Sequence, residues 1–314
     1  MMYIMVPTVV TTSNVVSSTA ATSLYEAYSA TKTYAQAAVV SREPLSYSNT
    51  SSAVVTYLNR DYESLQSGNL GKSPDANSTW WLDLGASNKM AMFDFYANVP
   101  TVATSPLVTQ VTLVKRVNSV VLFGVEATSV TLVVTNSTGT VMFTQTVLTS
   151  QRYTTRAYEY AFGEFLSQRK FAFLDLPPIT NGTYTLTVTN SGGSASIEAM
   201  CIGSATAIGE VPYGAEVDVL DFSTITRLPY GRLQLTPVKT IPKMSLEVIV
   251  KKQTLPALQR LKEENSAKPL VFLGLDDSTS QYFDPLLILG IFRRMPIVIS
   301  YPVASLVRID VESL

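Results

Sequence analysis

The stretch GTYTLTVTN, residues 182–190, carries the alternation that decides the fold of this 314-residue chain. Successive side chains of a β-strand point to opposite faces, so Tyr184, Leu186 and Val188 share one face while the threonines take the other. An apolar face backed by a polar face is what a half-buried strand requires. The pattern therefore predicts a strand that covers a core with one of its two faces.

Segments of the same kind fill much of the chain between residues 89 and 203. They are SPLVTQVTLV (105–114), NSVVLFGV (118–125), SVTLVVTN (129–136), GTVMFTQTVL (139–148), KFAFLDL (170–176) and ASIEAMCIG (195–203). Turn sequences separate several of them, namely NSTG (136–139), PPITNG (177–182) and NSGG (190–193). Short alternating strands at this spacing indicate an antiparallel β-sandwich over residues 88–205.

The composition indicates a chain that is folded over most of its length. Apolar residues make up 46% and charged residues 15% of the sequence, which is typical of packed β structure with a modest surface charge. Residues 8–22 are mostly Ser, Thr, Val and Ala without periodicity, and we expect an extended N-terminal arm over residues 1–24. Residues 25–87 are rich in tyrosine and turn-forming residues, with AVVTYL (53–58) among the strand candidates. They predict a small module whose aromatic side chains supply much of its core.

Residues 206–314 are predicted to form an α+β domain. In TLPALQRLKEEN (254–265), leucines at 255, 258 and 261 oppose a charged face, with Thr254 as candidate N-cap, so we expect one short amphipathic helix. Strand candidates follow in PLVFLGL (269–275), PLLILGIFRR (285–294), MPIVISY (295–301) and VASLVRIDVESL (303–314). In the last of these, four apolar residues are expected to share a face: Val303, Val307, Ile309 and Val311. The fold class predicted for the whole chain is mainly β.

Charge and residue usage exclude several kinds of chemistry. The 23 basic residues face 24 acidic ones without a basic block, which argues against nucleic-acid binding. The apolar runs are shorter than the roughly 20 residues of a membrane span. Histidine is absent, which removes Ser-His-Asp and Cys-His triads and histidine metal ligation. The single Cys201 is expected to be a buried small hydrophobic residue, and no glycine cluster has the context of a nucleotide-binding loop. We expect no cofactor and no metal.

Carboxylate pairs could still support a glycosidase, because that chemistry needs two acids some 5 to 10 Å apart. The candidates are Asp276 with Asp277, Asp61 with Glu63, and the group Glu210, Glu216, Asp218 and Asp221. The first pair precedes Ser278 in what reads as a solvated turn. The other acids alternate along strand-like runs, as charged outward faces do. We expect that the protein is not an enzyme.

Both tryptophans of the chain, Trp80 and Trp81, stand side by side in STWWLDLG (78–85). If this segment is a strand, one indole points inward and the other points outward. The outward ring, together with Tyr57 or Tyr62, could stack on a sugar ring. Alternatively, both tryptophans pack the seam between the small module and the sandwich, which so small a module would need.

The same segment carries a resemblance to known proteins. YESLQSGNLGKSPDANSTWWLDLG (62–85) is similar to the small chitin-binding-type modules of bacterial chitinases, and the likeness extends over about residues 34–85. In those modules exposed aromatic residues bind sugar. The resemblance therefore implies a sugar-binding role for Tyr62 and for Trp80 or Trp81.

From about residue 25 onward, the order of segments resembles a family of minor virion proteins of tailed bacteriophages. The resemblance rests on YESL (62–65), TWWLDLGASNKMAMFD (79–94), FLDLPP (173–178), Pro212-Tyr213-Gly214 and YPVASLVRIDVESL (301–314). It implies a sandwich of the jelly-roll, galactose-binding or discoidin-like kind. It also implies a structural, multi-copy part of the phage tail or of its tip, collar or fibre attachment, made in the host cytoplasm.

The main functional hypothesis is thus a non-enzymatic virion protein that contacts other tail subunits and copies of itself. The C-terminal domain and the N-terminal arm would dock to neighbours, while the sandwich and the aromatic module would face outward. An alternative is a carbohydrate-binding protein that recognises the host surface through the Trp/Tyr patch. A third hypothesis, a polysaccharide-cleaving enzyme, requires a carboxylate-lined cleft.

Overall fold

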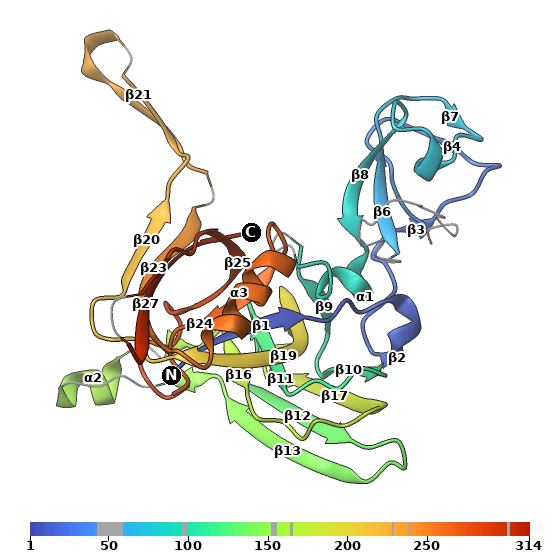
Figure 1. Cartoon of the computed structure of the whole chain (residues 1–314). Coiled ribbons are helices and arrows are strands. Elements are labelled where there is room, and N and C mark those ends of the chain that lie inside the picture. Colours follow the sequence, from blue (N-terminus) through green and yellow to red (C-terminus); the bar gives the residue numbers. More distant parts are fainter. Residues whose placement is uncertain are drawn as a thin grey trace. The chain divides into compact units, whose positions relative to one another are not determined.

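The computed structural model describes residues 1–42, 59–95, 99–151, 156–163, 166–227, 229–238, 240–299 and 302–314 (Figure 1). Most of its regular structure is antiparallel β, with three α-helices among the described residues, so the predicted mainly β fold is confirmed. The chain divides into two compact units. The first combines Met1–Pro7 with Gly203–Leu314, and the second is Thr8–Ile202.

The second unit contains the predicted sandwich. One layer is a five-stranded antiparallel sheet in the order β13 (Val141–Leu148), β12 (Ser129–Thr135), β17 (Gly182–Thr189), β10 (Leu107–Leu113) and β2 (Val15–Ser18). Facing it are β11 (Ser119–Phe123), β16 (Phe171–Phe173), β9 (Thr101–Thr104), β18 (Ser194–Ile197) and the beginning of β19 (Ala199–Gly209). Their apolar side chains interlock in one core cluster between the layers.

Strand β17 shows why the sequence folds in this way. Tyr184, Leu186 and Val188 are fully buried, as the alternation predicts, and the threonines between them are half-buried on the opposite face. Alternate residues of β10 and β12 are buried in the same way. One expected strand is divided, however. The segment 195–203 forms β18, which pairs with β9, and β19, which pairs with β11 and β1, with Glu198 between them.

The second unit also contains the small module predicted from tyrosines and turns. Its sheet has the order β3 (Glu26–Ala27), β5 (Val39–Arg42), β6 (Arg60–Ser64) and β8 (Trp81–Ala86), and β4 (Thr33–Tyr34) pairs with β7 (Asn69–Leu70). The core cluster of four buried residues includes three aromatic ones, which agrees with the prediction: Tyr34, Val40, Tyr62 and Trp81. The strand candidate at 53–58 lies outside the described residues.

Short elements complete the second unit. They are η1 (Thr12–Asn14), η2 (Pro74–Ala76), α1 (Asn88–Ala91), α2 (Ala157–Phe162) and the pair β14 (Ser150–Gln151) and β15 (Leu166–Ser167). Helix α1 belongs to the stretch TWWLDLGASNKMAMFD, whose Met90, Met92 and Phe93 are buried in the sandwich core. This stretch therefore joins the module to the sandwich by packing.

The described residues of the first unit form an α+β structure with one α-helix, as predicted for the C-terminal part. Its sheet has the order β19 (residues 203–209), β1 (Met2–Pro7), β24 (Leu270–Leu273), β25 (Leu287–Arg294), β27 (Ala304–Ser313), β23 (Ile241–Lys251) and β20 (Glu216–Leu220); β26 (Ile297–Val298) pairs with β27. Helix α3 (Leu255–Glu264) buries Leu258 against the apolar face of this sheet.

Two details of this unit differ from the sequence analysis. Thr254 precedes α3 at the N-cap position, but its side chain makes no capping hydrogen bond. Val303 precedes β27 and is largely exposed, whereas Val307, Ile309 and Val311 are buried as expected. The reason is that the alternation of faces holds only within the strand, which begins at Ala304.

Within the predicted N-terminal arm, two segments form strands that pair with other strands of the same chain. Met2–Pro7 pairs with β19 on one side and with β24 on the other, and it buries Met2 and Ile4. Val15–Ser18 pairs with β10 in the other unit. Residues 1–24 thus contribute to two sheets of their own chain. No local pattern predicts this, because the partners lie about 90 to 270 residues away.

A two-stranded hairpin extends from strands β20 and β23 of the first unit (Figure 1). It consists of β21 (Thr224–Arg227), the turn η3 (Pro229–Gly231) and β22 (Leu233–Thr236). We call these residues the projecting hairpin. Tyr230 and Gly231 at its turn both have positive φ, 68° and 81°, as the tight turns of hairpins require.

Candidate functional site

The aromatic module packs two tyrosine rings against one tryptophan. Trp81, the first residue of β8, meets Tyr34 and Tyr28 edge-on, with ring centroids 5.4 and 5.9 Å apart. The two tyrosines stack on each other at 5.8 Å. The indole N–H of Trp81 donates to the backbone carbonyl of Lys72 at 2.8 Å, so its polar atom is satisfied. These rings form a packed core.

The four residues predicted to contact a glycan occupy different environments. Trp81 and Tyr62 are only 2% and 8% exposed and belong to the core of the module. Trp80 is half-buried and packs against that core from outside. Tyr57 lies outside the described residues. Of the three described rings, Trp80 therefore has the most accessible surface.

Trp80 lies in a turn, so its orientation is not set by the alternation of a β-strand. Strand β8 begins one residue later, and the N–H groups of Trp80 and Trp81 both donate to the carbonyl of Asn77 at 3.0 Å. The ammonium of Lys72 lies 5.8 Å from the centroid of the Trp80 ring. A single half-buried ring beside a cation offers a small stacking platform.

Asp61 and Asp277, one acid from each of two predicted carboxylate pairs, lie in different environments. Asp61 is buried on β6 and accepts a hydrogen bond from Ser23 Oγ at 3.0 Å, and burial raises the pKa of Asp61. Asp277 is exposed and accepts hydrogen bonds from the side chain and backbone of Thr279, which lower the pKa of Asp277. This second acid holds a solvated turn, as the sequence suggested.

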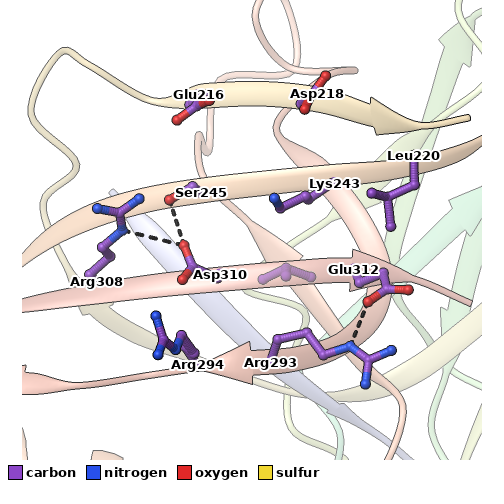
Figure 2. A pocket seen from close by; sticks show the side chains of 11 residues that line it. Glu216, Asp218, Leu220, Lys243, Ser245, Arg293, Arg294, Arg308, Asp310 and Glu312 are labelled. Carbon is purple, nitrogen blue, oxygen red and sulfur yellow. Dashed lines mark hydrogen bonds and ion pairs between the residues drawn. The ribbon is translucent and has the colours of Figure 1, made fainter.

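A hollow of about 500 Å³ lies on the outer face of the sheet of the first unit (Figure 2). Four neighbouring strands, β20, β23, β27 and β25, supply its walls. Its charged side chains are evenly divided between bases and acids: Lys243, Arg293, Arg294, Arg308, Glu216, Asp218, Asp310 and Glu312. The hollow is therefore close to neutral but strongly polar.

Hydrogen bonds fix the acids at the floor of the hollow (Figure 2). Ser245 Oγ donates to Asp310 Oδ1 at 2.6 Å, and Arg308 Nε donates to the same oxygen at 3.4 Å. Arg293 pairs with Glu312. The bond from Ser245 holds the pKa of Asp310 below its usual value, and the bond from Arg293 does the same for Glu312. Both acids are thus kept ionised.

Other charged side chains that line the hollow are not paired in this way. Among the described residues, the side chains of Lys243, Arg294 and Glu216 make no hydrogen bond or ion pair. Their charges are exposed to solvent. They are available to a charged partner, whereas the acids of the floor are already paired.

The projecting hairpin carries a third candidate surface. Ile225 lies opposite Leu235 and Arg227 lies opposite Leu233, so these four residues share one face of the hairpin. Thr224, Thr226, Gln234 and Thr236 take the other face. The three aliphatic side chains of the first face are between 52% and 67% exposed. We call Ile225, Leu233 and Leu235 the apolar face of the hairpin.

The sequence analysis did not identify the hollow or the apolar face of the hairpin as sites. Each nevertheless corresponds to a recognisable pattern in the sequence. Charged residues recur at every second position in EVD (216–218) and RIDVE (308–312), which predicts a charged strand face. The run TITRLPYGRLQLT (224–236) has turn residues at its centre, as a hairpin does. What the sequence does not show is that these faces stay uncovered.

The single cysteine is buried, as the sequence predicts. Cys201 is fully buried, and burial raises the pKa of its thiol. Within the part of the chain that the structure describes, no group of three or more acidic or cysteine side chains could hold a metal ion. In that same part, no helix combines the length and apolarity needed to cross a bilayer.

Comparisons with known proteins return no match for this chain: no family model, no curated protein and no solved structure is similar to it at a significant level.

Proposed function

We propose that this chain is a non-enzymatic structural component of a tailed-phage virion. It works in the tail or at its tip, collar or fibre attachment, through contacts with neighbouring subunits. The observation that carries the proposal is the apolar face of the projecting hairpin, which no described residue covers. The type of particle is inferred from the resemblance of the segment order to that of minor virion proteins of tailed phages.

The hairpin supports a role in contact because it is poorly stabilised alone. A two-stranded hairpin without a further layer is marginally stable in water. This hairpin instead exposes Ile225, Leu233 and Leu235 on one face, and aliphatic side chains gain free energy when they are removed from water. A protein that functions in isolation gains nothing from such a face. A subunit of an assembly can bury it against a neighbour.

The size of this face indicates a contact with something larger than another hairpin. Three half-exposed aliphatic side chains present on the order of 300 Å² of apolar surface. A specific interface buries about 800 Å² on each partner. Pairing of two hairpins face to face is therefore too small to hold two copies together. We infer that the hairpin inserts as one part of a wider subunit contact.

The proposal is tested by asking whether virions contain the chain and whether its incorporation requires the apolar face of the hairpin. Mass spectrometry of virions purified from cells that carry the encoding genome should detect the chain in fixed stoichiometry. The double variant Ile225→Ser with Leu235→Ser should be lost from the particles. The matched control is Thr224→Ser with Thr236→Ser on the polar face of the same strands, which should be incorporated normally. Particles that lack the wild-type chain would overturn the proposal.

Contact with host glycan is a narrower candidate function, and it now centres on Trp80. Trp80 is the most accessible of the three described rings that were predicted to bind sugar. Stacking on a sugar would use the ring face that Lys72 does not approach. Binding of host polysaccharide by wild-type protein but not by Trp80→Ala would support this role.

A further inference from the structure

Strand β20 is the last strand of the sheet in the first unit. It pairs with β23 from Glu216 to Leu220 and has no described partner on its other side. The N–H of Val219 donates to Oδ1 of Asp218 at 2.8 Å, which indicates that this group points to the free side. An open edge of this kind presents backbone donors and acceptors to any strand that approaches it.

The charged face of the sheet alternates in sign up to this edge. Asp218 lies opposite Lys243, Lys243 lies opposite Glu312, and Glu312 pairs with Arg293. The row thus reads negative, positive, negative and positive from β20 inward (Figure 2). Opposite charges on neighbouring strands stabilise a sheet, and like charges destabilise it. A strand added beyond β20 would continue the row if it placed a cation beside Asp218.

Glu216 is a second acidic residue on this edge that a cation of an added strand would complement. Glu216 lies opposite Ser245, which is neutral, and its carboxylate has no partner among the described side chains. Glu216 and Asp218 are two residues apart and so face the same side of β20. An incoming strand would therefore meet two acids with basic residues spaced two apart.

The other face of β20 is apolar and uncovered. Val217 and Val219 are 44% and 53% exposed, and Val217 lies opposite Met244, which is buried in the core of this unit. The apolar surface of the core therefore continues onto β20 and ends there without a described neighbour. Aliphatic residues between the two cations of an added strand would extend that surface.

A second copy of β20 does not fit this edge. Antiparallel pairing of two such strands would place Glu216 and Asp218 of one copy opposite the same acids of the other. Like charges directly opposite each other disfavour that arrangement. The occupant must differ from this strand in charge.

We propose that β20 accepts, as an additional strand, an extended segment of a partner protein in which Lys or Arg alternates with aliphatic residues. Such strand addition takes affinity from backbone hydrogen bonds and specificity from alternate side chains. The strand addition rests on the proposed function, because a subunit that works by contact needs defined partners. It is nevertheless tested on the isolated full chain, without particles.

The probes are two synthetic seven-residue peptides, one alternating Lys with Val and the other alternating Glu with Val. Fluorescence anisotropy should show binding of the Lys–Val peptide about tenfold or more tighter than of the Glu–Val peptide, since two cross-strand pairs change sign. Hydrogen exchange should slow at the amides of Val217 and Val219 when the Lys–Val peptide is present. A Lys–Val peptide with N-methyl groups along one edge of its backbone should lose binding.

Two variants separate strand addition from simple charge attraction. Glu216→Lys with Asp218→Lys should invert the preference, so that the Glu–Val peptide binds more tightly. Glu264→Lys with Glu263→Lys on the exposed face of α3 makes the same change in net charge and should leave the preference as in wild type. Equal binding of both peptides, no slowed exchange at millimolar peptide, or undiminished binding of the N-methylated peptide would overturn the proposal. Absence of the chain from virions would instead count against the proposed function alone.

Discussion

The aromatic module and the projecting hairpin place their large apolar side chains differently. Each is a small β structure with few large apolar residues. In the module, Tyr34, Tyr62 and Trp81 are buried in one core cluster. In the hairpin, Ile225, Leu233 and Leu235 line one face with nothing described above them. Large apolar residues therefore stabilise the fold in one region and stay exposed in the other.

The exposed fraction of the side chains, and not their hydrophobicity, distinguishes these two regions. Tryptophan is enriched among residues that contribute strongly to binding, so it is a common candidate for a binding site in a sequence. In this chain Trp81 is a core residue, while ordinary leucines and an isoleucine form an uncovered surface on the described hairpin. Substitutions in the two regions should accordingly change different measurements.

The largest expected effect is that of Trp81→Ala. Removal of a buried tryptophan leaves a cavity and the carbonyl of Lys72 without its donor, so the free energy of unfolding of the module should fall by about 3–5 kcal/mol. Hydrogen exchange at the amides of β5, β6 and β8 measures this loss. The control Trp80→Ala, which truncates a half-buried ring, should cost clearly less. Equal losses from both variants would remove the distinction between them.

A smaller effect of opposite sign is expected from Asp61→Asn in the same module. Burial raises the folded-state pKa of Asp61, so the charged carboxylate costs stability when it is ionised in both states. Above the folded-state pKa, the Asp61→Asn variant should therefore have a more stable module than wild type. As pH falls through the folded-state pKa toward the unfolded value of 3.8, this advantage should disappear.

Urea denaturation of both proteins from pH 7 down to pH 3 measures the Asp61 effect. Ser23→Ala, which removes a donor to the carboxylate, is a useful companion and should be destabilising at neutral pH. An Asp61→Asn variant that is less stable than wild type at pH 7 would show that the hydrogen bonds of Asp61 outweigh its burial.

The acids on the charged face should respond to pH in the reverse direction. The pKa values of Asp310 and Glu312 are lowered in the folded state, so their contribution is fully present above the unfolded values of 3.8 and 4.5. It should be lost as pH falls through the lowered values. Because these groups are close to solvent, Glu312→Gln should cost less than about 1 kcal/mol at pH 7. Denaturation of this variant from pH 7 to pH 2 should show a flatter acid limb than wild type.

The smallest expected effect on stability belongs to the apolar face of the hairpin. Ile225→Ser with Leu235→Ser should change the free energy of unfolding of the isolated chain by no more than about 0.5 kcal/mol, because both side chains are exposed. The comparison variant is Leu186→Ala in the sandwich core, with an expected cost of about 2–5 kcal/mol. Thermal unfolding measures both. A large loss from the hairpin variant would mean that its apolar face already packs within the chain.

Much of the fold could be predicted because β alternation is local. The strands at 107–113, 129–135 and 182–189 follow from which side chains share a face, and helix α3 follows from leucines three apart. The candidate site was harder to predict, because it depends on accessibility. Trp80 and Trp81 are adjacent and chemically identical, yet the turn at Asn77 sets one outside the core and the strand sets the other inside.

The mainly β class, the faces of individual strands, the aromatic core of the module and the lack of histidine chemistry all follow from the sequence alone. Each of these depends on neighbours within a few residues or on composition. Three features instead emerge only when the chain is folded: Met2–Pro7 lies between β19 and β24, β20 ends a sheet, and no described residue covers the hairpin face. Pairing over hundreds of residues depends on which surfaces meet, and no local pattern encodes that.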